Sequence, residues 1–221
     1  MIKVSFCAYD KPDSVGGPLT WLVNLLPALR EHGIESRCLF MTHWGDTGPF
    51  MEKLRSEGFD CPQVACHDHT HDRAKWILAQ LKQAPPDVFV PNLVVAGYFA
   101  GAWVRQAGIP TVGILHSDDA FYRGIQDEFV FGRRTFQVSA LACVSSELKR
   151  QVQERQPRGT SVHRIPYGVP APERKRVRSS GKLRMAFVGR LAEEQKRISL
   201  VTRALCVATK KVAGTEAVLF G

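Results

Sequence analysis

The chain has 221 residues, of which 44% are hydrophobic, 9% aromatic and 23% charged. This composition is ordinary for a globular protein and excludes a disordered, collagen-like or coiled-coil chain, while the length allows one medium domain or two small ones. Thirty Lys and Arg against 21 Asp and Glu give a formal charge of +9, which favours an anionic partner such as nucleic acid, an acidic membrane surface or a phosphorylated small molecule.

Short apolar runs alternate with segments of helical period along the whole chain. Most of the runs are continuously apolar, as expected for strands that are buried on both faces. The expected strands are Ile2–Ala8, Ser36–Phe40, Gln63–Cys66, Asp87–Pro91, Thr111–Leu115, Leu141–Val144, Val162–Ile165, Arg184–Val188 and Ala217–Phe220. The expected helices are Pro18–Glu31, with a kink at Pro27, and Phe50–Glu57, Asp72–Gln83, Val94–Gln106, Tyr122–Phe136, Ser146–Glu154 and Ile198–Val212. The alternation predicts a doubly wound parallel, Rossmann-like α/β sheet with helices on both faces.

A stretch rich in Pro, Gly and basic residues divides the chain after residue 168. We expect an N-terminal domain over residues 1–168, an interdomain linker over 169–182 and the first βαβ unit of a second Rossmann-like domain over 183–221. A single βαβ unit cannot bury both faces of its sheet, so this second domain is expected to be incomplete.

Targeting signals are weak in this sequence. The apolar stretch before Asp10 is too short for a signal-peptide core, and the longest uncharged run, Val88–Val104, falls short of the roughly 20 apolar residues of a spanning helix. Cysteines such as Cys7 and Cys143 lie in apolar runs, which is typical of free thiols in a reducing compartment. We therefore expect a cytoplasmic protein without a transmembrane segment.

The turn between the first strand and the first helix is the first candidate binding site. Gly16 and Gly17 precede the helix, where free backbone N–H groups and the helix dipole attract anions. The turn lacks the G-x-G-x-x-G pattern of nicotinamide dinucleotide sites, and a plain tight turn is the alternative.

His116 follows the apolar strand Thr111–Leu115 directly. Ligands of doubly wound folds bind beyond the carboxyl ends of the strands, so an imidazole there could contact a substrate hydroxyl or act as an acid or base. A satisfied structural histidine is the alternative.

Two basic residues follow the strand Arg184–Val188. Arg190 and Lys196 could neutralise a diphosphate, the first by paired hydrogen bonds and the second as a point charge. Taken alone, this loop could equally be a solvated charged surface.

Metal-binding residue types gather between Cys61 and Asp72. The two cysteines, Cys61 and Cys66, have the wrong spacing for a zinc site and no second ligand pair follows, so we expect no metal. Asp72 is better explained as a helix N-cap. The sequence also lacks the G-x-S-x-G, Walker and H-E-x-x-H motifs, and the basic linker lacks the interleaved aromatics of a nucleic-acid surface, so we expect no nucleic-acid partner.

Four motifs occur in a recognisable order. They are Val15-Gly16-Gly17-Pro18 after the first strand, the strand Leu141–Val144 running into Ser145-Ser146-Glu147, the segment Ile165-Pro166-Tyr167-Gly168-Val169, and Phe187-Val188-Gly189-Arg190-Leu191 continuing to Lys196. In this order they resemble the landmarks of the retaining GT-B glycosyltransferases of family 4.

The resemblance implies transfer of a sugar from a nucleotide-sugar donor to a hydroxyl acceptor, either a sugar or a lipid-linked sugar, with retention of configuration. It implies that His116 is catalytic and contacts the donor sugar. Gly16, Gly17, Arg190 and Lys196 would bind the donor diphosphate, without a metal or other cofactor. Exposed tryptophans such as Trp44 or Trp103 would suit peripheral contact with the inner membrane face.

Two features depart from the family pattern. Tyr167 stands where the family usually has Asn, and the family's pair of glutamates for the nucleotide ribose and donor sugar would lie beyond Gly221. We therefore expect the 221 residues to be inactive by themselves. A non-catalytic acceptor- or partner-binding module derived from such an enzyme is the alternative.

Overall fold

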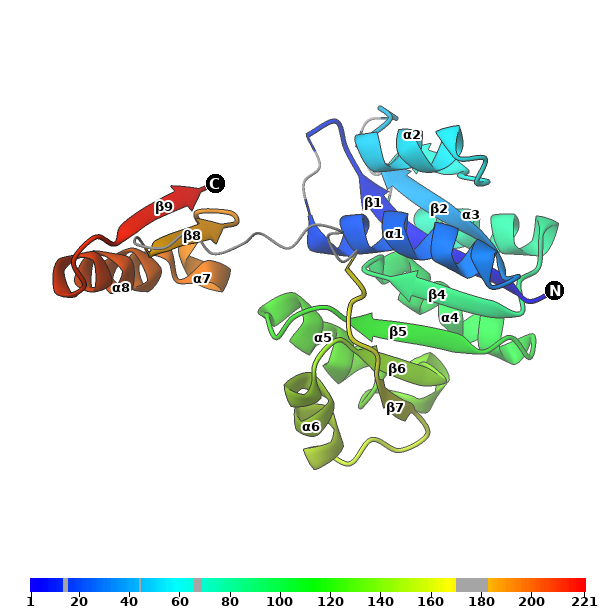
Figure 1. The fold of residues 1–221 in the computed structure, drawn as a ribbon. Coiled ribbons are helices and arrows are strands. Elements are labelled where there is room, and N and C mark those ends of the chain that lie inside the picture. Colours follow the sequence, from blue (N-terminus) through cyan, green and yellow to red (C-terminus); the bar gives the residue numbers. More distant parts are fainter. Residues whose placement is uncertain (14–15, 44, 66–68, 170–182) are drawn as a thin grey trace. The chain divides into compact units, whose positions relative to one another are not determined.

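The computed structural model describes residues 1–13, 16–43, 45–65, 69–169 and 183–221. The chain divides into two compact units, Met1–Gly168 and Val169–Gly221, and each has its own parallel sheet (Figure 1). Apart from Val169, the expected linker lies outside the described residues.

The first unit contains a seven-stranded sheet in the order β3-β2-β1-β4-β5-β6-β7, and every neighbouring pair is parallel. Its strands are β1 (Lys3–Asp10), β2 (Glu35–Thr42), β3 (Gln63–Ala65), β4 (Val88–Asn92), β5 (Thr111–Leu115), β6 (Ala140–Cys143) and β7 (Ser161–Arg164). The predicted doubly wound parallel sheet is therefore confirmed.

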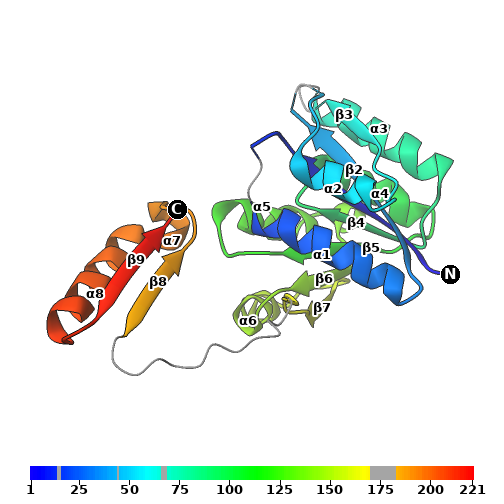
Figure 2. The ribbon, with the colours of Figure 1, turned by 45° about the horizontal axis from the view of Figure 1, so that its top comes forward.

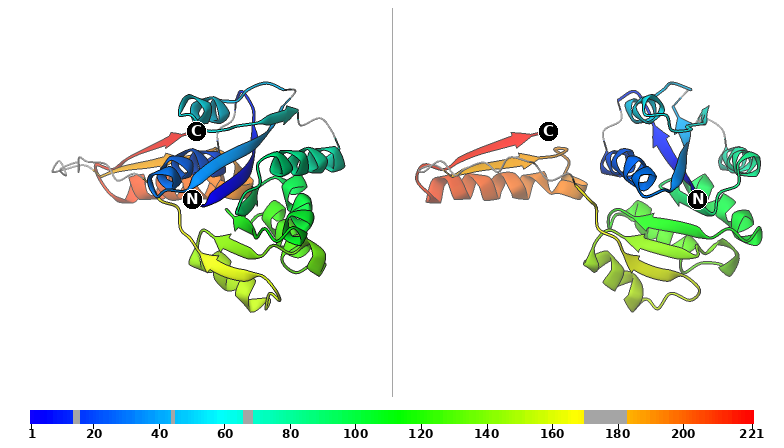
Figure 3. Two further views of the ribbon diagram at one scale, coloured as in Figure 1. Left: turned by 90° about the vertical axis from the view of Figure 1, so that its right-hand side faces the viewer. Right: turned by 45° about the vertical axis from the view of Figure 1, so that its right-hand side comes forward.

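Helices cover both faces of this sheet (Figure 2, Figure 3). Their bounds are α1 (Gly17–Glu31), α2 (Pro49–Ser56), α3 (Thr70–Gln83), α4 (Val95–Gln106), α5 (Ala120–Phe129) and α6 (Ser146–Glu154). Because side chains alternate along a strand, Phe6 of β1 packs with α1 and α2, while the adjacent Cys7 packs with α3 and α4. This two-sided burial explains why the strands are continuously apolar.

Helix α1 shows how the sequence pattern becomes structure. Its buried residues recur with the helical period and form the stripe that faces the sheet; they are Leu19, Leu22, Val23 and Leu26. Pro18 lies in the first turn, where its missing N–H costs nothing. Pro27 lies inside the helix, which nevertheless continues to Glu31.

The single helix expected over Tyr122–Phe136 is wrong. Helix α5 ends at Phe129, and a 3-10 turn over Arg134–Phe136 follows. Gly132 explains part of the break, because a Cβ there would stand 2.3 Å from the backbone oxygen of Glu128. The chain turns too tightly at this glycine for the helix to continue.

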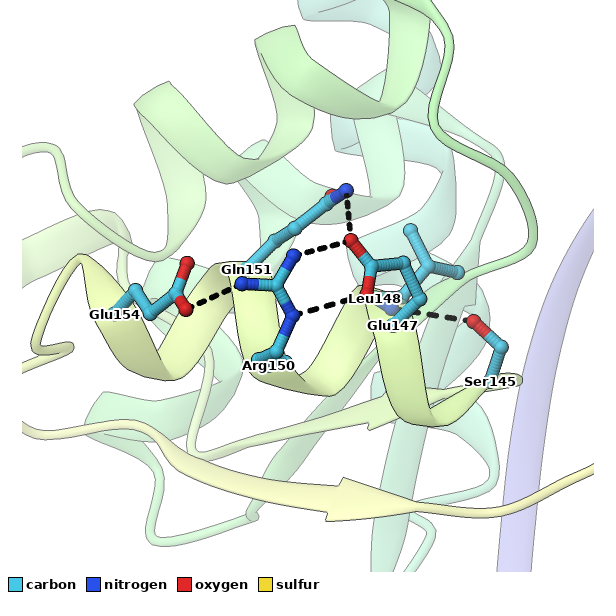
Figure 4. Close-up of polar contacts among 6 residues, drawn as sticks. All are labelled: Ser145, Glu147, Leu148, Arg150, Gln151 and Glu154. Carbon is cyan, nitrogen blue, oxygen red and sulfur yellow. Dashed lines mark hydrogen bonds and ion pairs between the residues drawn. The ribbon is translucent and has the colours of Figure 1, made fainter.

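The Ser-Glu step after β6 builds the start of α6 (Figure 4). The hydroxyl of Ser145 accepts a hydrogen bond of 3.1 Å from the backbone N–H of Leu148 and so caps the helix. Glu147 accepts hydrogen bonds from Arg150 and Gln151 at the surface, and the bonds from Arg150 lower the pKa of its carboxyl group. This part of the family-like pattern serves the helix cap and an exposed ion pair.

The second unit is a single βαβ arrangement. It consists of β8 (Arg184–Val188), α7 (Glu193–Lys196), α8 (Ile198–Lys211) and β9 (Glu216–Phe220), with β8 parallel to β9. None of the described side chains of α8 is buried, so this unit has little core of its own. Across the described ranges of both units, no helix is long and apolar enough to span a bilayer.

Candidate active site

The strand order of the first sheet reverses at β1, which lies between β2 and β4. Connections leave in opposite directions at such a point and open a crevice beyond the carboxyl ends of the strands. Here these ends are Asp10 of β1 and Asn92 of β4, and β5 beside them leads into His116. The topology therefore brings residues from three distant parts of the sequence to one edge.

A pocket of about 320 Å³ lies at this edge. Its volume is at the lower end of the range of small-molecule sites. Most of its lining is apolar, and it is built from the ends of β1 and β2 and the start of α1; the lining residues are Tyr9, Asp10, Lys11, Gly16, Pro18, Leu19, Met41, His43 and Leu93. Such a lining suits a ligand that combines an apolar surface with a few polar groups.

The buried carboxylate of Asp10 ties this edge to α2. It accepts a hydrogen bond of 2.8 Å from the backbone N–H of Met51 and one of 2.9 Å from that of Lys11. Gly48 leaves room for the carboxylate, because a Cβ at Gly48 would lie 2.1–2.4 Å from its atoms. Asp10 therefore caps α2, and its role in this structure is to hold the pocket wall.

The imidazole of His116 is held on both of its nitrogens. Nε2 lies 2.7 Å from Oδ1 of Asn92, and Nδ1 is hydrogen-bonded to the hydroxyl of Tyr167. The rings of Trp21 and Tyr122 contact the imidazole edge-on, with centroids 5.3 and 5.7 Å away. The histidine is therefore fixed in position by residues from four elements or loops.

Burial keeps this cluster uncharged at neutral pH. It lowers the pKa of His116 from 6.5 to about 4, since an imidazolium would lose its hydration. Burial also raises the pKa of Tyr167 to about 12 and pushes the pKa of Tyr122 upward. His116 is thus a neutral hydrogen-bonding group at pH 7 and not a cation.

Gly16 and Gly17 form the start of α1, as expected. Gly16 is the N-cap in extended conformation, and its carbonyl accepts from the N–H and the hydroxyl of Thr20. A Cβ at either glycine would meet no atom of the described residues within 4 Å. Trp21, one turn further along, touches His116, and the two candidates therefore share one edge.

Arg190 and Lys196 belong to the second unit, in the loop and short helix after β8. Gly189 precedes them, and the side chain of Lys196 passes 3.9 Å from the position that a Cβ of Gly189 would take. The lysine thus folds back over the end of β8. Diphosphate binding by this loop, and its relation to His116, stay predictions.

The cysteine-rich and histidine-rich segment offers no metal site in the part of the chain that the structure describes. Cys66, His67 and Asp68 lie outside that part. Asp72 is not the N-cap of α3, because the helix begins at Thr70 and His69 occupies the cap position. Burial raises the pKa of Cys61 to about 12, so its thiol is protonated at neutral pH and a poor ligand.

A second cavity, of about 610 Å³, opens at the opposite edge of the sheet. Its lining includes Ser5 and Arg37, and the Arg37 guanidinium already donates to Ser5, to the carbonyl oxygens of Gln80 and Ala84, and to Asp60. Sequence reasoning did not anticipate this cavity. Since parallel α/β sheets bind ligands at the carboxyl edge, we assign the functional site to that edge.

Sequence analysis missed Asn92 and the partners of His116. Asn92 follows Pro91 at the end of a central strand, where a proline is out of place unless the strand is bulged. The sequence Pro91-Asn92 at the end of a central strand was therefore the local signal that could have indicated Asn92. The contacts of Trp21 and Tyr167 with His116 join positions far apart in the chain and left no local signal.

The family model of Glycosyltransferase Family 4 matches residues 15–172. The matched segment covers most of the first unit, including Gly16, Asn92 and His116. The chain belongs to this family. A search of curated proteins gave no match.

Solved structures with the same fold include glycosyltransferases of GT-B type. The apo form of the lipopolysaccharide outer core galactosyltransferase WaaB is 16% identical with a TM-score of 0.65, over 99% of this chain and 60% of that one. A glycosyltransferase from Rickettsia africae ESF-5 is 12% identical with a TM-score of 0.61, over 100% and 68%. The UDP-GlcNAc 2-epimerase from Neisseria meningitidis, bound to UDP-GlcNAc, is 11% identical with a TM-score of 0.52, over 99% and 65%.

These similarities establish the GT-B fold for the chain, as predicted. An epimerase shares that fold with the transferases, so the fold does not by itself decide the reaction. The chain spans about 60% of the length of WaaB.

Proposed function

We propose that this protein is a glycosyltransferase that moves a sugar from a nucleotide-sugar donor to a hydroxyl acceptor. The observation that carries the proposal is the family match over residues 15–172. A ligand-sized pocket at the switch point and a neutral, firmly held His116 at the same edge support it. In this proposal the pocket beside Gly16 takes the acceptor, and the second unit takes the nucleotide.

In the proposed reaction, positive charge develops at the sugar C1 and negative charge on the departing diphosphate. The bond between the sugar C1 and the diphosphate oxygen breaks, its electron pair stays on the diphosphate, and the acceptor oxygen forms the new bond to C1. The acceptor proton goes to the departing diphosphate oxygen. We propose that this transfer retains the anomeric configuration, in keeping with the family resemblance.

His116 suits this reaction because it is neutral. A positive imidazolium would repel the positive charge that develops at C1, whereas a neutral ring can accept a hydrogen bond from a donor-sugar hydroxyl and orient the sugar. Arg190 and Lys196 would stabilise the negative diphosphate, and the backbone N–H groups at Gly16 and Gly17 would add the positive end of the α1 dipole.

We also propose a cytoplasmic location with peripheral contact at the inner membrane face. The formal charge of +9 and the exposed Trp103, with 53% of its surface accessible, support contact with an anionic surface. Trp44 lies outside the described residues. Cosedimentation with anionic and neutral vesicles would test this part, and W103A should reduce binding to the anionic vesicles only.

The central test is binding of nucleotides by the full chain. At millimolar concentration, at least one of uridine, guanosine and adenosine diphosphate should raise the melting temperature of the protein. The double variant R190A/K196A should not show this rise. R203A, an exposed arginine on α8, is the matched control. If no diphosphate or nucleotide-sugar raises the melting temperature, the alternative of a non-catalytic binding module is favoured. When transfer is detected, the anomeric configuration of the product tests retention.

A further inference from the structure

We propose that Asn92 is a positioning residue that sets the tautomer of His116. In this tautomer Nε2 carries the hydrogen, and Nδ1 offers its lone pair to a hydroxyl of the donor sugar. This inference rests on the proposed function for its use, but its structural part can be measured without any transfer.

An irregularity of the backbone in the central strand β4 positions Asn92. It is unfavourable because it interrupts the hydrogen bonding between strands. Pro91 cannot donate a ladder hydrogen bond, and the pairing of β4 with β5 shifts so that Phe89 faces Thr111 while Asn92 faces Gly113. Three steps along β4 therefore correspond to two along β5, which is a bulge. Bulges beside active sites commonly redirect a side chain, and this one turns Asn92 toward His116.

Asn92 itself has a positive φ of 50°. Asn adopts this left-handed conformation more readily than most residues, yet it remains unfavourable relative to a strand. The backbone strain therefore lies at Asn92, the residue whose side chain is hydrogen-bonded to Nε2 of His116.

The side chain of Asn92 is fully buried but only half satisfied. Oδ1 lies 2.7 Å from His116 Nε2, while Nδ2 has no hydrogen-bond partner within the described part of the chain. An unsatisfied buried N–H group is destabilising, because it has lost its hydrogen bonds to water. Within the described residues, the amide therefore makes its hydrogen bond to His116 through Oδ1 and leaves Nδ2 unsatisfied.

The acceptor Oδ1 dictates where the imidazole proton lies. A carbonyl oxygen accepts only, so Nε2 must carry the hydrogen, and the neutral ring then has its lone pair on Nδ1. The hydroxyl of Tyr167 donates to that lone pair. With Oδ1 facing Nε2, the hydrogen bonds run from Tyr167 through His116 to Asn92, and the opposite tautomer would need Nδ2 of the amide to face Nε2.

The other titratable groups near the ring do not disturb this arrangement. Tyr122 of α5 and Tyr167 are uncharged at neutral pH, and burial raises both of their pKa values further. Asp119 caps α5 and accepts from Ser117 and from the backbone N–H of Tyr122. When the donor binds, a hydroxyl of its sugar would take the place of the Tyr167 hydroxyl and donate the hydrogen bond to Nδ1 of His116.

The test follows the ring nitrogens of His116 by NMR, in the full chain labelled with 15N at histidine. The wild-type protein should show a single neutral tautomer with hydrogen on Nε2 between pH 5.5 and 8. H116Q identifies the signals among the seven histidines. Hydrogen on Nδ1 in the wild type would overturn the inference without the need for any variant.

Two variants separate the amide from the backbone. N92G keeps the positive φ at no steric cost and removes the amide, and it should yield a mixture of tautomers. N92D places a negative charge beside Nε2 and should raise the pKa of His116 by between about 1 and 3 pH units. N24D puts the same charge on an exposed position of α1 and should leave the His116 pKa unchanged. An unchanged Nε2–H tautomer in folded N92G would overturn the inference.

Failure of the proposed function would look different. The tautomer would follow Asn92 as described, while no nucleotide-sugar would bind. If the donor does bind, its addition should change the NMR signal of Nδ1 as the Tyr167 hydrogen bond is replaced. N92D should then shift the pH profile of kcat/KM by the same amount as the pKa of His116 measured by NMR.

Discussion

The hydroxyl of Tyr167 is hydrogen-bonded to Nδ1 of His116, across 51 residues of sequence. Tyr167 stands at the position where the resembling family usually has Asn, directly before the end of the first unit at Gly168. The departure that sequence analysis could not interpret is therefore part of the candidate active site, and it covers the ring nitrogen that we assign to the donor sugar.

Removing this hydroxyl should raise the pKa of His116. Burial holds the pKa of His116 at about 4, and the Tyr167 hydrogen bond further favours the neutral imidazole, because only the neutral ring has a lone pair on Nδ1. Y167F should therefore raise the pKa above about 4 while burial stays in place. Histidine NMR titration measures the change. Y122F, which alters a ring neighbour, serves as the comparison, and a His116 pKa that falls in Y167F would contradict the assignment.

The stability of the first unit should depend on pH through His116. Its folded pKa of about 4 lies below the ordinary value of 6.5, so between these values the unfolded chain binds a proton that the folded chain excludes. The free energy of unfolding should therefore fall from pH 6.5 to pH 4, by about 3 kcal/mol, and be unaffected by this group above pH 6.5.

Urea unfolding at a series of pH values tests this dependence. H116Q cannot take up the proton, so its stability curve should be flatter than that of the wild type between pH 4 and 6.5. Parallel curves for the two proteins would mean that His116 is not held neutral by burial.

Asp10 and Gly48 should be energetically coupled. D10A removes the acceptor of the Met51 N–H and should cost about 1–3 kcal/mol, while D13N in the exposed loop should cost little. G48A would drive a methyl group into the Asp10 carboxylate and should also destabilise the fold.

Combining the two changes tests the contact. With the carboxylate gone in D10A, the new methyl group has space, so the double variant should be more stable than the sum of the single effects implies. Chemical denaturation of all four proteins gives the coupling. Strict additivity would show that Gly48 does not accommodate Asp10 in solution.

The two units should differ in their ability to fold alone. A fragment of residues 1–168 keeps all three buried clusters and should unfold cooperatively. A fragment of residues 169–221 leaves Leu200, Val207 and Phe220 exposed and should lack a cooperative transition. Circular dichroism during heating measures both, and a cooperative transition in the smaller fragment would contradict the prediction.

Local patterns were sufficient for most elements of the fold. The expected bounds of β5, β8 and α6 agree with the structure to the residue, because apolar runs and the Ser145 cap are local signals. The error at Tyr122–Phe136 has a local cause as well, since the break depends on how tightly the chain turns at Gly132. Helical periodicity alone does not report such a turn.

The sequence by itself determined that this is a doubly wound α/β protein with the motif order of Glycosyltransferase Family 4, and that Gly16, Gly17 and His116 lie where strands end and helices begin. Those conclusions need only the period of apolar residues and the order of motifs along the chain. Only the tertiary structure decided what surrounds His116. The sheet order places β4 beside β5, and the bulge at Pro91 brings the Asn92 amide to Nε2. Burial then removes the charge of the imidazole, a property that depends on neighbours from distant segments and that no local pattern contains.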